Sequence, residues 1–272
     1  MQKLFHKSPV FAGCCFGYGL SIAFLLMERL LLDWSYTEKW VYIDGTLRLL
    51  FGLAGLLILK GIRKETFVEQ FKKKIDKKVI IYLVPIMIFF MLEITLFAFA
   101  ENIIFSHINS FFLMWITQIT TGLWEETACR GILMSGMLLK WSSTVKGRIA
   151  CVMISGLLFG SLHFFSFIYG NDMISCLWSA LYTSLWGMFM GAIYMVSDNL
   201  LLVMFIHAIW DIVVRIPDYF MEGYREGILL NTVYVLQDII QLAVFPIAAI
   251  GICIVSAKFY HESEANAKCC TE

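Results

Sequence analysis

Charged side chains are scarce in this sequence: they make up 15% of its 272 residues, whereas about 25% is usual in a soluble domain. Hydrophobic residues account for 60%, and they recur in long runs along the whole chain instead of forming one terminal anchor. The runs are about 20 residues long and do not alternate with polar residues, which favours membrane-spanning helices over strands. The sequence therefore predicts an all-α, polytopic transmembrane helical bundle.

The chain also lacks a net charge, because 21 Lys and Arg residues balance 21 Asp and Glu residues. Nothing in that balance favours a nucleic-acid partner, and we expect none. The eight cysteines form no CxxC pair, and most lie inside apolar runs, so we interpret them as packing residues. The first apolar run ends in Glu28-Arg29 without a small-residue cleavage site, which predicts a retained span and not a signal peptide.

Eight candidate spans follow from the apolar runs, and only Asp198-Asn199 separates the sixth from the seventh, as in a tight helical hairpin. In order, the spans cover residues 9–31, 41–62, 79–100, 111–140, 149–169, 173–197, 200–216 and 232–259. Within this single domain we distinguish three N-terminal spans with a basic loop, the core helices, and a last span with its tail. These parts cover residues 1–110, 111–216 and 217–272.

Three charged residues stand near the middle of the fourth apolar run: Glu125, Glu126 and Arg130. An ionisable side chain at such a position costs roughly 2.5–3.5 kcal/mol on insertion scales, which makes it a candidate for function. Glu126 and Arg130 are four residues apart, in the favourable order for an ion pair on one helical face. Glu125 lies about 100° round the helix, so it points elsewhere and stays available for acid–base chemistry.

Two further apolar runs carry histidines. The fifth contains Phe159-Gly-Ser-Leu-His163, and the seventh contains His207-Ala-Ile-Trp-Asp211, in which His207 and Asp211 share one helical face. A lone histidine within a span is more often a hydrogen-bonded packing residue than a functional one. Several ionisable groups on three separate spans nevertheless indicate a shared site.

Together these segments resemble the motifs EExxxR, FxxxH and HxxxN or HxxxD of the CPBP family, in that order on successive core helices. The family comprises type II CAAX prenyl endopeptidases and their bacterial relatives in bacteriocin processing and immunity. In this chain the motifs are Glu125-Glu126-Thr-Ala-Cys-Arg130, Phe159-Gly-Ser-Leu-His163 and His207-Ala-Ile-Trp-Asp211. The resemblance covers about residues 110–215, and the other spans match only in being apolar.

This resemblance implies an intramembrane endopeptidase that cuts a membrane-associated protein or peptide near its C-terminus, with the cell membrane as the expected location. A bacteriocin immunity or scaffold protein that keeps the fold without catalysis is the alternative within the family. A transporter is a third possibility. It is disfavoured because the intramembrane charges match a hydrolytic motif set and no inverted repeat is visible.

The resemblance also implies roles for the motif residues. Glu125 would deprotonate a water molecule, which His163 would help to hold, and His207 and residue 211 would stabilise the oxyanion. This chain has Asp211 where the better-described enzymes have Asn. A carboxylate only accepts hydrogen bonds, so Asp211 is either a protonated donor or an anion that orients His207. The complete set of expected site residues is Glu125, Glu126, Arg130, His163, His207 and Asp211.

In the same scheme Glu126 and Arg130 would fix the helix and tune Glu125. No cofactor is expected, although the family is often labelled a metalloprotease family. The sequence lacks an HExxH zinc helix, a GxSG serine loop and the paired aspartates of GxGD proteases, which argues against those protease classes. Glu125, His163 and His207 could in principle ligate zinc, and this alternative stays open.

Two charged features lie outside the motifs. Arg48 in the second span and Glu93 in the third are a candidate ion pair across two helices. The basic run from Arg63 to Lys78 is predicted to be a cytoplasmic loop that meets anionic lipid headgroups.

The distribution of Lys and Arg outside the spans predicts that both termini lie in the cytoplasm. The tails and the loops after the second and fourth spans hold 15 of them, and the opposite side holds four, namely Arg29, Lys39, Arg215 and Arg225. Cysteine labelling or reporter fusions should therefore place both termini and the basic loop on the cytoplasmic face. Termini found on opposite faces would contradict the arrangement of eight spans.

Overall fold

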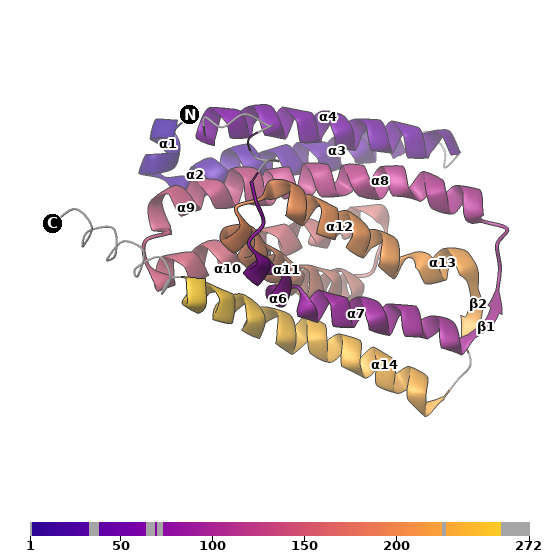
Figure 1. Ribbon diagram of the computed structural model, residues 1–272. Helices are drawn as coiled ribbons and strands as arrows, with labels where there is room; N and C mark the ends of the chain where they lie inside the picture. The colour runs from indigo at the N-terminus through magenta and orange to yellow at the C-terminus, as the bar shows by residue number, and fades with distance from the viewer. Residues whose placement is uncertain (1, 33–37, 64–68, 70–72, 225–226, 257–272) are drawn as a thin grey trace.

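The computed structural model describes residues 2–32, 38–63, 69, 73–224 and 227–256, and most of them are helical. The axes of the long helices are roughly aligned, and the helices form a bundle (Figure 1). Helices suit these apolar runs because lipid offers no partner for a backbone amide or carbonyl, so the hydrogen bonds must be made within the segment. The predicted all-α transmembrane bundle is confirmed.

The N-terminal part begins with short helices that lead into two long ones. Its elements are α1 (Gln2–Lys7), α2 (Pro9–Gly13), the π-helical turn η1 (Cys14–Tyr18), α3 (Gly19–Leu32) and α4 (Glu38–Arg63). A third apolar segment follows the basic loop. It consists of α6 (Lys77–Tyr82), α7 (Val84–Thr95) and the 3-10 turn η2 (Leu96–Phe99).

The core helices follow without another long connection. They are α8 (Ile108–Glu126), the π-helical η3 (Thr127–Met134), α9 (Ser135–Trp141), α10 (Val145–Phe164), the 3-10 turn η4 (Phe165–Tyr169), α11 (Met173–Ser197), α12 (Leu200–Val214) and α13 (Ile216–Phe220). The last segment contains α14 (Ile228–Ile239) and the π-helical η5 (Ile240–Val244), and it stays helical to Ser256.

Five of the eight predicted spans are long and apolar enough to cross a membrane by themselves. They are Pro9–Leu31, Val41–Arg63, Val145–Tyr169, Met173–Ser197 and Leu230–Ser256. The third and seventh predicted spans are shorter apolar helices, Val84–Phe99 and Leu200–Val214. The fourth is the continuous helical path through α8, η3 and α9, which carries the three motif charges. The predicted end of the eighth span, residues 257–259, lies outside the described residues.

Both ends of the described chain lie at one end of the bundle, on the left in Figure 1. Lys140 Nζ donates to the Lys7 carbonyl at 3.3 Å, and Arg148 Nη1 donates to Ser256 Oγ at 3.2 Å. These bonds join the N-terminal helix to α9 and the last helix to α10. The shared end agrees with an even number of crossings. The predicted positions of Lys64, Lys72, Lys258 and Lys268 fall outside the described residues, and the cytoplasmic location of this end stays a prediction.

Asp198, in the turn between α11 and α12, fastens the basic loop to the same end of the bundle. It adopts a left-handed conformation with φ of 45°, and its carboxylate pairs with Arg63 at 2.7 Å and also with Lys73. Burial raises the pKa of Asp198, but the hydrogen bonds and positive charges of Arg63 and Lys73 outweigh it and hold the pKa below its usual range. The predicted hairpin of the sixth and seventh spans is thus confirmed and tied to α4.

Close helix contacts occur at several glycines, and two of these contacts join core helices. A methyl group added to Gly160 on α10 would lie 2.0 Å from Ser184 Oγ on α11, and one added to Gly122 on α8 would lie 2.6 Å from the Met204 carbonyl on α12. Real side chains do not tolerate such distances, so the helices can approach this closely only at glycine. The contact of α8 with α12 brings the first and third motifs together.

A short antiparallel ribbon was not predicted. Strand β1 (Ala100–Ile103) pairs with β2 (Met221–Tyr224), and Asn102 lies opposite Glu222. The ribbon joins the chain just before α8 to the chain just after α13, on the right in Figure 1. Strands of four residues are too short to give a clear alternating pattern in the sequence.

Candidate active site

The first motif lies where α8 passes into the wider helix η3. Glu125 and Glu126 end α8, and Arg130 follows within η3. Segments of π-helix are rare and frequently occur at functional sites. Arg130 Nη1 still reaches Glu126 Oε1 at 3.0 Å, and both side chains are fully buried. The predicted ion pair of Glu126 and Arg130 is therefore present.

Arg130 also connects this pair to the two neighbouring helices. Its Nη2 donates to the carbonyl of Gly187 on α11 at 2.9 Å, and its guanidinium lies over the ring of Phe159 on α10, 4.6 Å from the centroid. A buried arginine that lost its partners would carry a large desolvation penalty. Phe159 of the second motif thus packs against the guanidinium of Arg130 in the first motif.

His207 on α12 binds the same carboxylate oxygen. Its Nδ1 lies 2.7 Å from Glu126 Oε1, and its Nε2 lies 3.6 Å from Glu125 Oε2 and 3.7 Å from Asp211 Oδ2. Only the first distance is a hydrogen bond. Glu126 therefore fixes Nδ1 of the His207 ring, and Nε2 faces the carboxyl groups of Glu125 and Asp211.

Glu125 differs from Glu126 in its surroundings, as expected from the sequence. Its Oε2 has no hydrogen-bond partner among the described residues, and its side chain is 12% exposed. His163 lies on α10 with Nδ1 3.3 Å from the Phe159 carbonyl, and its ring meets the Phe159 ring edge to face. Glu125 and His163 line the same two cavities, so space for a water molecule or a substrate exists beside both.

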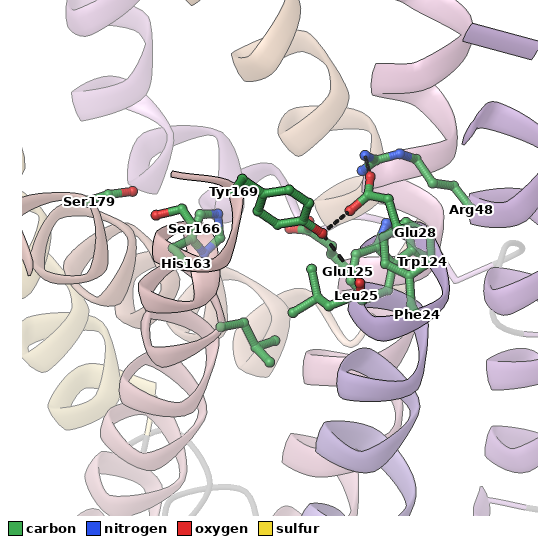
Figure 2. Close-up of a pocket in the computed structure, with 11 residues that line it drawn as sticks. Phe24, Leu25, Glu28, Arg48, Trp124, Glu125, His163, Ser166, Tyr169 and Ser179 are labelled. Atoms are coloured by element: carbon green, nitrogen blue, oxygen red, sulfur yellow. Dashed lines mark hydrogen bonds and ion pairs between the residues drawn. The ribbon is translucent and has the colours of Figure 1, made fainter. Parts of the chain in front are cut away.

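The two cavities have different walls, and each measures about 190 Å³. The polar cavity is lined on one side by α8 and α12, with Gln118, Thr121, His207 and Asp211 among its residues. The mixed cavity lies toward α3 and η4 and is shown in Figure 2. Its walls include Phe24, Trp124, Leu162, Ser166 and Tyr169. Glu125, His163 and one further residue, Arg48, line both cavities.

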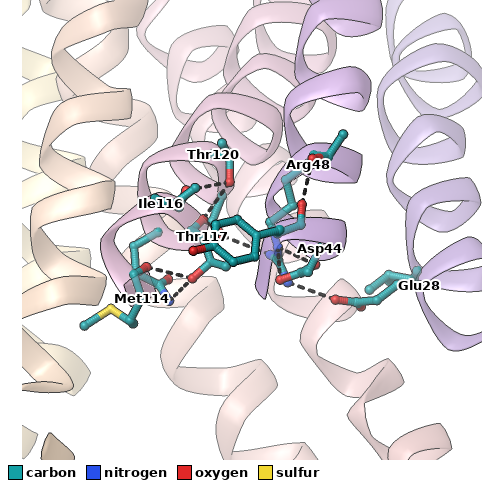
Figure 3. A network of polar contacts seen from close by, with 12 residues as sticks. Glu28, Asp44, Arg48, Met114, Ile116, Thr117 and Thr120 are labelled. Atoms are coloured by element: carbon teal, nitrogen blue, oxygen red, sulfur yellow. Dashed lines mark hydrogen bonds and ion pairs between the residues drawn. The ribbon is translucent and has the colours of Figure 1, made fainter. Parts of the chain in front are cut away.

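The predicted pair of Arg48 and Glu93 is wrong. Arg48 Nε donates to both carboxylate oxygens of Asp44 at 2.9 Å, and its Nη2 donates to Glu28 Oε1 at 2.9 Å (Figure 3). Asp44 and Arg48 are four residues apart in one apolar run, so their spacing was a usable signal. Glu28 is on another helix, and no local pattern connects it to Arg48.

All six expected site residues thus lie close to Glu125 or in the walls of its cavities. Glu126 and Arg130 are buried behind it, while His163, His207 and Asp211 face the cavity. Among the described residues, no group of three or more His, Cys, Asp or Glu side chains is arranged to hold a metal ion.

Comparison with known proteins agrees with the motif analysis. Residues 107–213 match the model of a family described as type II CAAX prenyl endopeptidase Rce1-like. The matched segment runs from the residue before α8 nearly to the end of α12, and it contains all three motifs. It confirms the family resemblance and leaves α3 and α4 outside the match. Neither a curated protein nor a solved structure matches the chain.

The geometry predicts different stabilities for variants of the adjacent glutamates. Glu126→Gln should lower the free energy of unfolding by on the order of 3 kcal/mol, because Arg130 and His207 lose their shared anion inside the bundle. Glu125→Gln is the matched control and should stay near the wild-type stability. Thermal unfolding in detergent measures both. Equal stability of the two variants would contradict the structural role of Glu126.

Proposed function

We propose that this protein, whose residues 107–213 are of the Rce1-like family, is an intramembrane endopeptidase in which Glu125 activates water. The observation that carries the proposal is the position of Glu125. Of the three charges in the first motif, it is the one without a local partner, and it lines two cavities opposite His163. A carboxylate held in this way can take a proton from a bound water molecule.

The proposed reaction begins when Glu125 removes a proton from water held between it and His163. The water oxygen attacks the peptide carbonyl, and the carbonyl oxygen becomes negative. His207 in its imidazolium form donates from Nδ1 to Glu126 and from Nε2 to this oxyanion. Glu125 then passes its proton to the leaving amine as the C–N bond breaks, so the carboxylate is regenerated.

The remaining motif residues support these steps. Asp211 lies on the oxyanion side, since its Oδ2 is 3.7 Å from His207 Nε2, and it either donates to the oxyanion as a protonated acid or orients His207 as an anion. Arg130 offsets the negative charge of Glu126 and holds its carboxyl group in place for the contact with His207. The roles of all six residues belong to this proposal.

The substrate is proposed to be a membrane-associated protein or peptide, because Glu125 is reached through cavities between apolar helices. The protein is an integral membrane protein, and the cell membrane with cytoplasmic termini is its proposed arrangement. The alternative, a bacteriocin immunity or scaffold role without catalysis, predicts that Glu125 is dispensable.

Replacement of Glu125 tests the proposal directly. Glu125→Gln should lower peptide cleavage by at least about 10²-fold, because the amide cannot accept the proton of water. Glu101→Gln, which changes an exposed glutamate on β1, is the matched control and should cleave normally. Peptide profiling of membranes with each variant measures the products. Near-full turnover by Glu125→Gln would contradict the base assignment, and an intact cellular phenotype in that variant would favour the immunity role.

The mechanism needs no metal ion, and metal analysis tests that point separately. Purified protein should contain no stoichiometric zinc by elemental analysis, and its cleavage rate should survive strong chelators. Stoichiometric zinc that is lost together with activity and restored with it would assign Glu125, His163 and His207 to a ligand role instead.

A further inference from the structure

Arg48 is held in one position by three neighbours that leave part of its guanidinium unused. Its Nε donates to Asp44, its Nη2 to Glu28 and its Nη1 to Thr121, all at 2.9 Å (Figure 3). A guanidinium has five N–H groups, so these bonds leave two of them for another acceptor. The side chain of Arg48 is 17% exposed, and Arg48 lines both cavities.

Arg48 is placed where a bound peptide could reach it. It lines the polar and the mixed cavity, together with Glu125 and His163. A chain that occupied both cavities would therefore pass Arg48 at the point where it passes the proposed catalytic base. Water can bind these donors in the cavities, and a peptide that displaces this water must supply acceptors in its place.

The charges around Arg48 decide which acceptor fits. Glu28 and Asp44 bring two negative charges to one guanidinium, and Glu125 adds a third carboxyl group nearby. A further anion would meet net repulsion. A neutral acceptor would meet no such repulsion. The backbone carbonyl oxygens are neutral acceptors present in every peptide.

We propose that Arg48 is a substrate-binding residue whose two spare N–H groups bind backbone carbonyl oxygens of the peptide beside Glu125. The inference rests on the proposed peptidase function and adds a residue from α4, outside the family-matched segment. Glu28, Asp44 and Thr121 are its positioning residues, which fix the guanidinium before the peptide binds. A rigid donor loses little freedom on binding, which is what makes it effective.

A purely structural role must be separated from this one, because Arg48 also neutralises Glu28 and Asp44. The variant Arg48→Gln alone would leave both carboxylates without their cation and should be less stable. The triple variant Glu28→Gln/Asp44→Asn/Arg48→Gln removes all three charges and keeps side chains of similar size. It should recover most of the wild-type melting temperature.

The decisive measurement is cleavage kinetics of the stable triple variant. Its KM should rise about tenfold to a hundredfold, the effect of losing hydrogen bonds from a charged donor, with a smaller change in kcat. Glu101→Gln, which changes an exposed glutamate on β1 outside both cavities, is the control, and its KM should stay near the wild-type value. Peptides with a C-terminal acid or a C-terminal amide should show the same dependence on Arg48.

Each other outcome overturns part of the proposal. A stable triple variant with wild-type KM would make Arg48 structural and leave the peptidase function intact. A dependence on Arg48 that vanishes with the C-terminal amide would identify a carboxylate as the ligand and refute the carbonyl assignment. Absence of cleavage by the wild-type protein would refute the proposed function and this inference with it.

Discussion

One carboxylate oxygen, Oε1 of Glu126, holds the site together. It accepts a hydrogen bond from Arg130 and binds His207, and Arg130 in turn reaches α10 and α11 through Phe159 and Gly187. In lipid these groups have no water to return to, so each depends on the others. Because Glu126 binds both Arg130 and His207, Glu125 next to it is left without a hydrogen bond at Oε2 beside the cavities. The two adjacent glutamates therefore have different surroundings, one within the buried polar network and one at the cavity wall.

The site also depends on helices that the motifs do not include. Glu28 on α3 lines the mixed cavity, and Arg48 on α4 lines both cavities. Tyr169 at the end of η4 donates to Glu28 Oε2 at 2.8 Å, which ties the helix of His163 to the N-terminal pair. A family model that matches residues 107–213 thus covers the six motif residues but only part of the cavity walls.

Interactions within one helix could be predicted from the sequence, and interactions between helices could not. The pair of Glu126 and Arg130 and the shared face of His207 and Asp211 follow from a spacing of four residues. The bundle follows from apolar length. The length of an apolar run does not say which helices are neighbours. The candidate pair of Arg48 and Glu93 is therefore wrong, and the bond of Arg48 to Glu28 depends on the packing of α3 against α4. The π-helical η3 also leaves no mark in the spacing of the motif.

The ribbon of β1 and β2 has a consequence for how the protein responds to its bilayer. Helices in membranes tilt when the thickness of the hydrocarbon layer changes, and two helices that tilt independently slide along each other. The ribbon joins the chain before α8 to the chain after α13, so it opposes such sliding at that end of the bundle. The two helices it restrains in this way, α8 and α12, are those that carry Glu125 and His207.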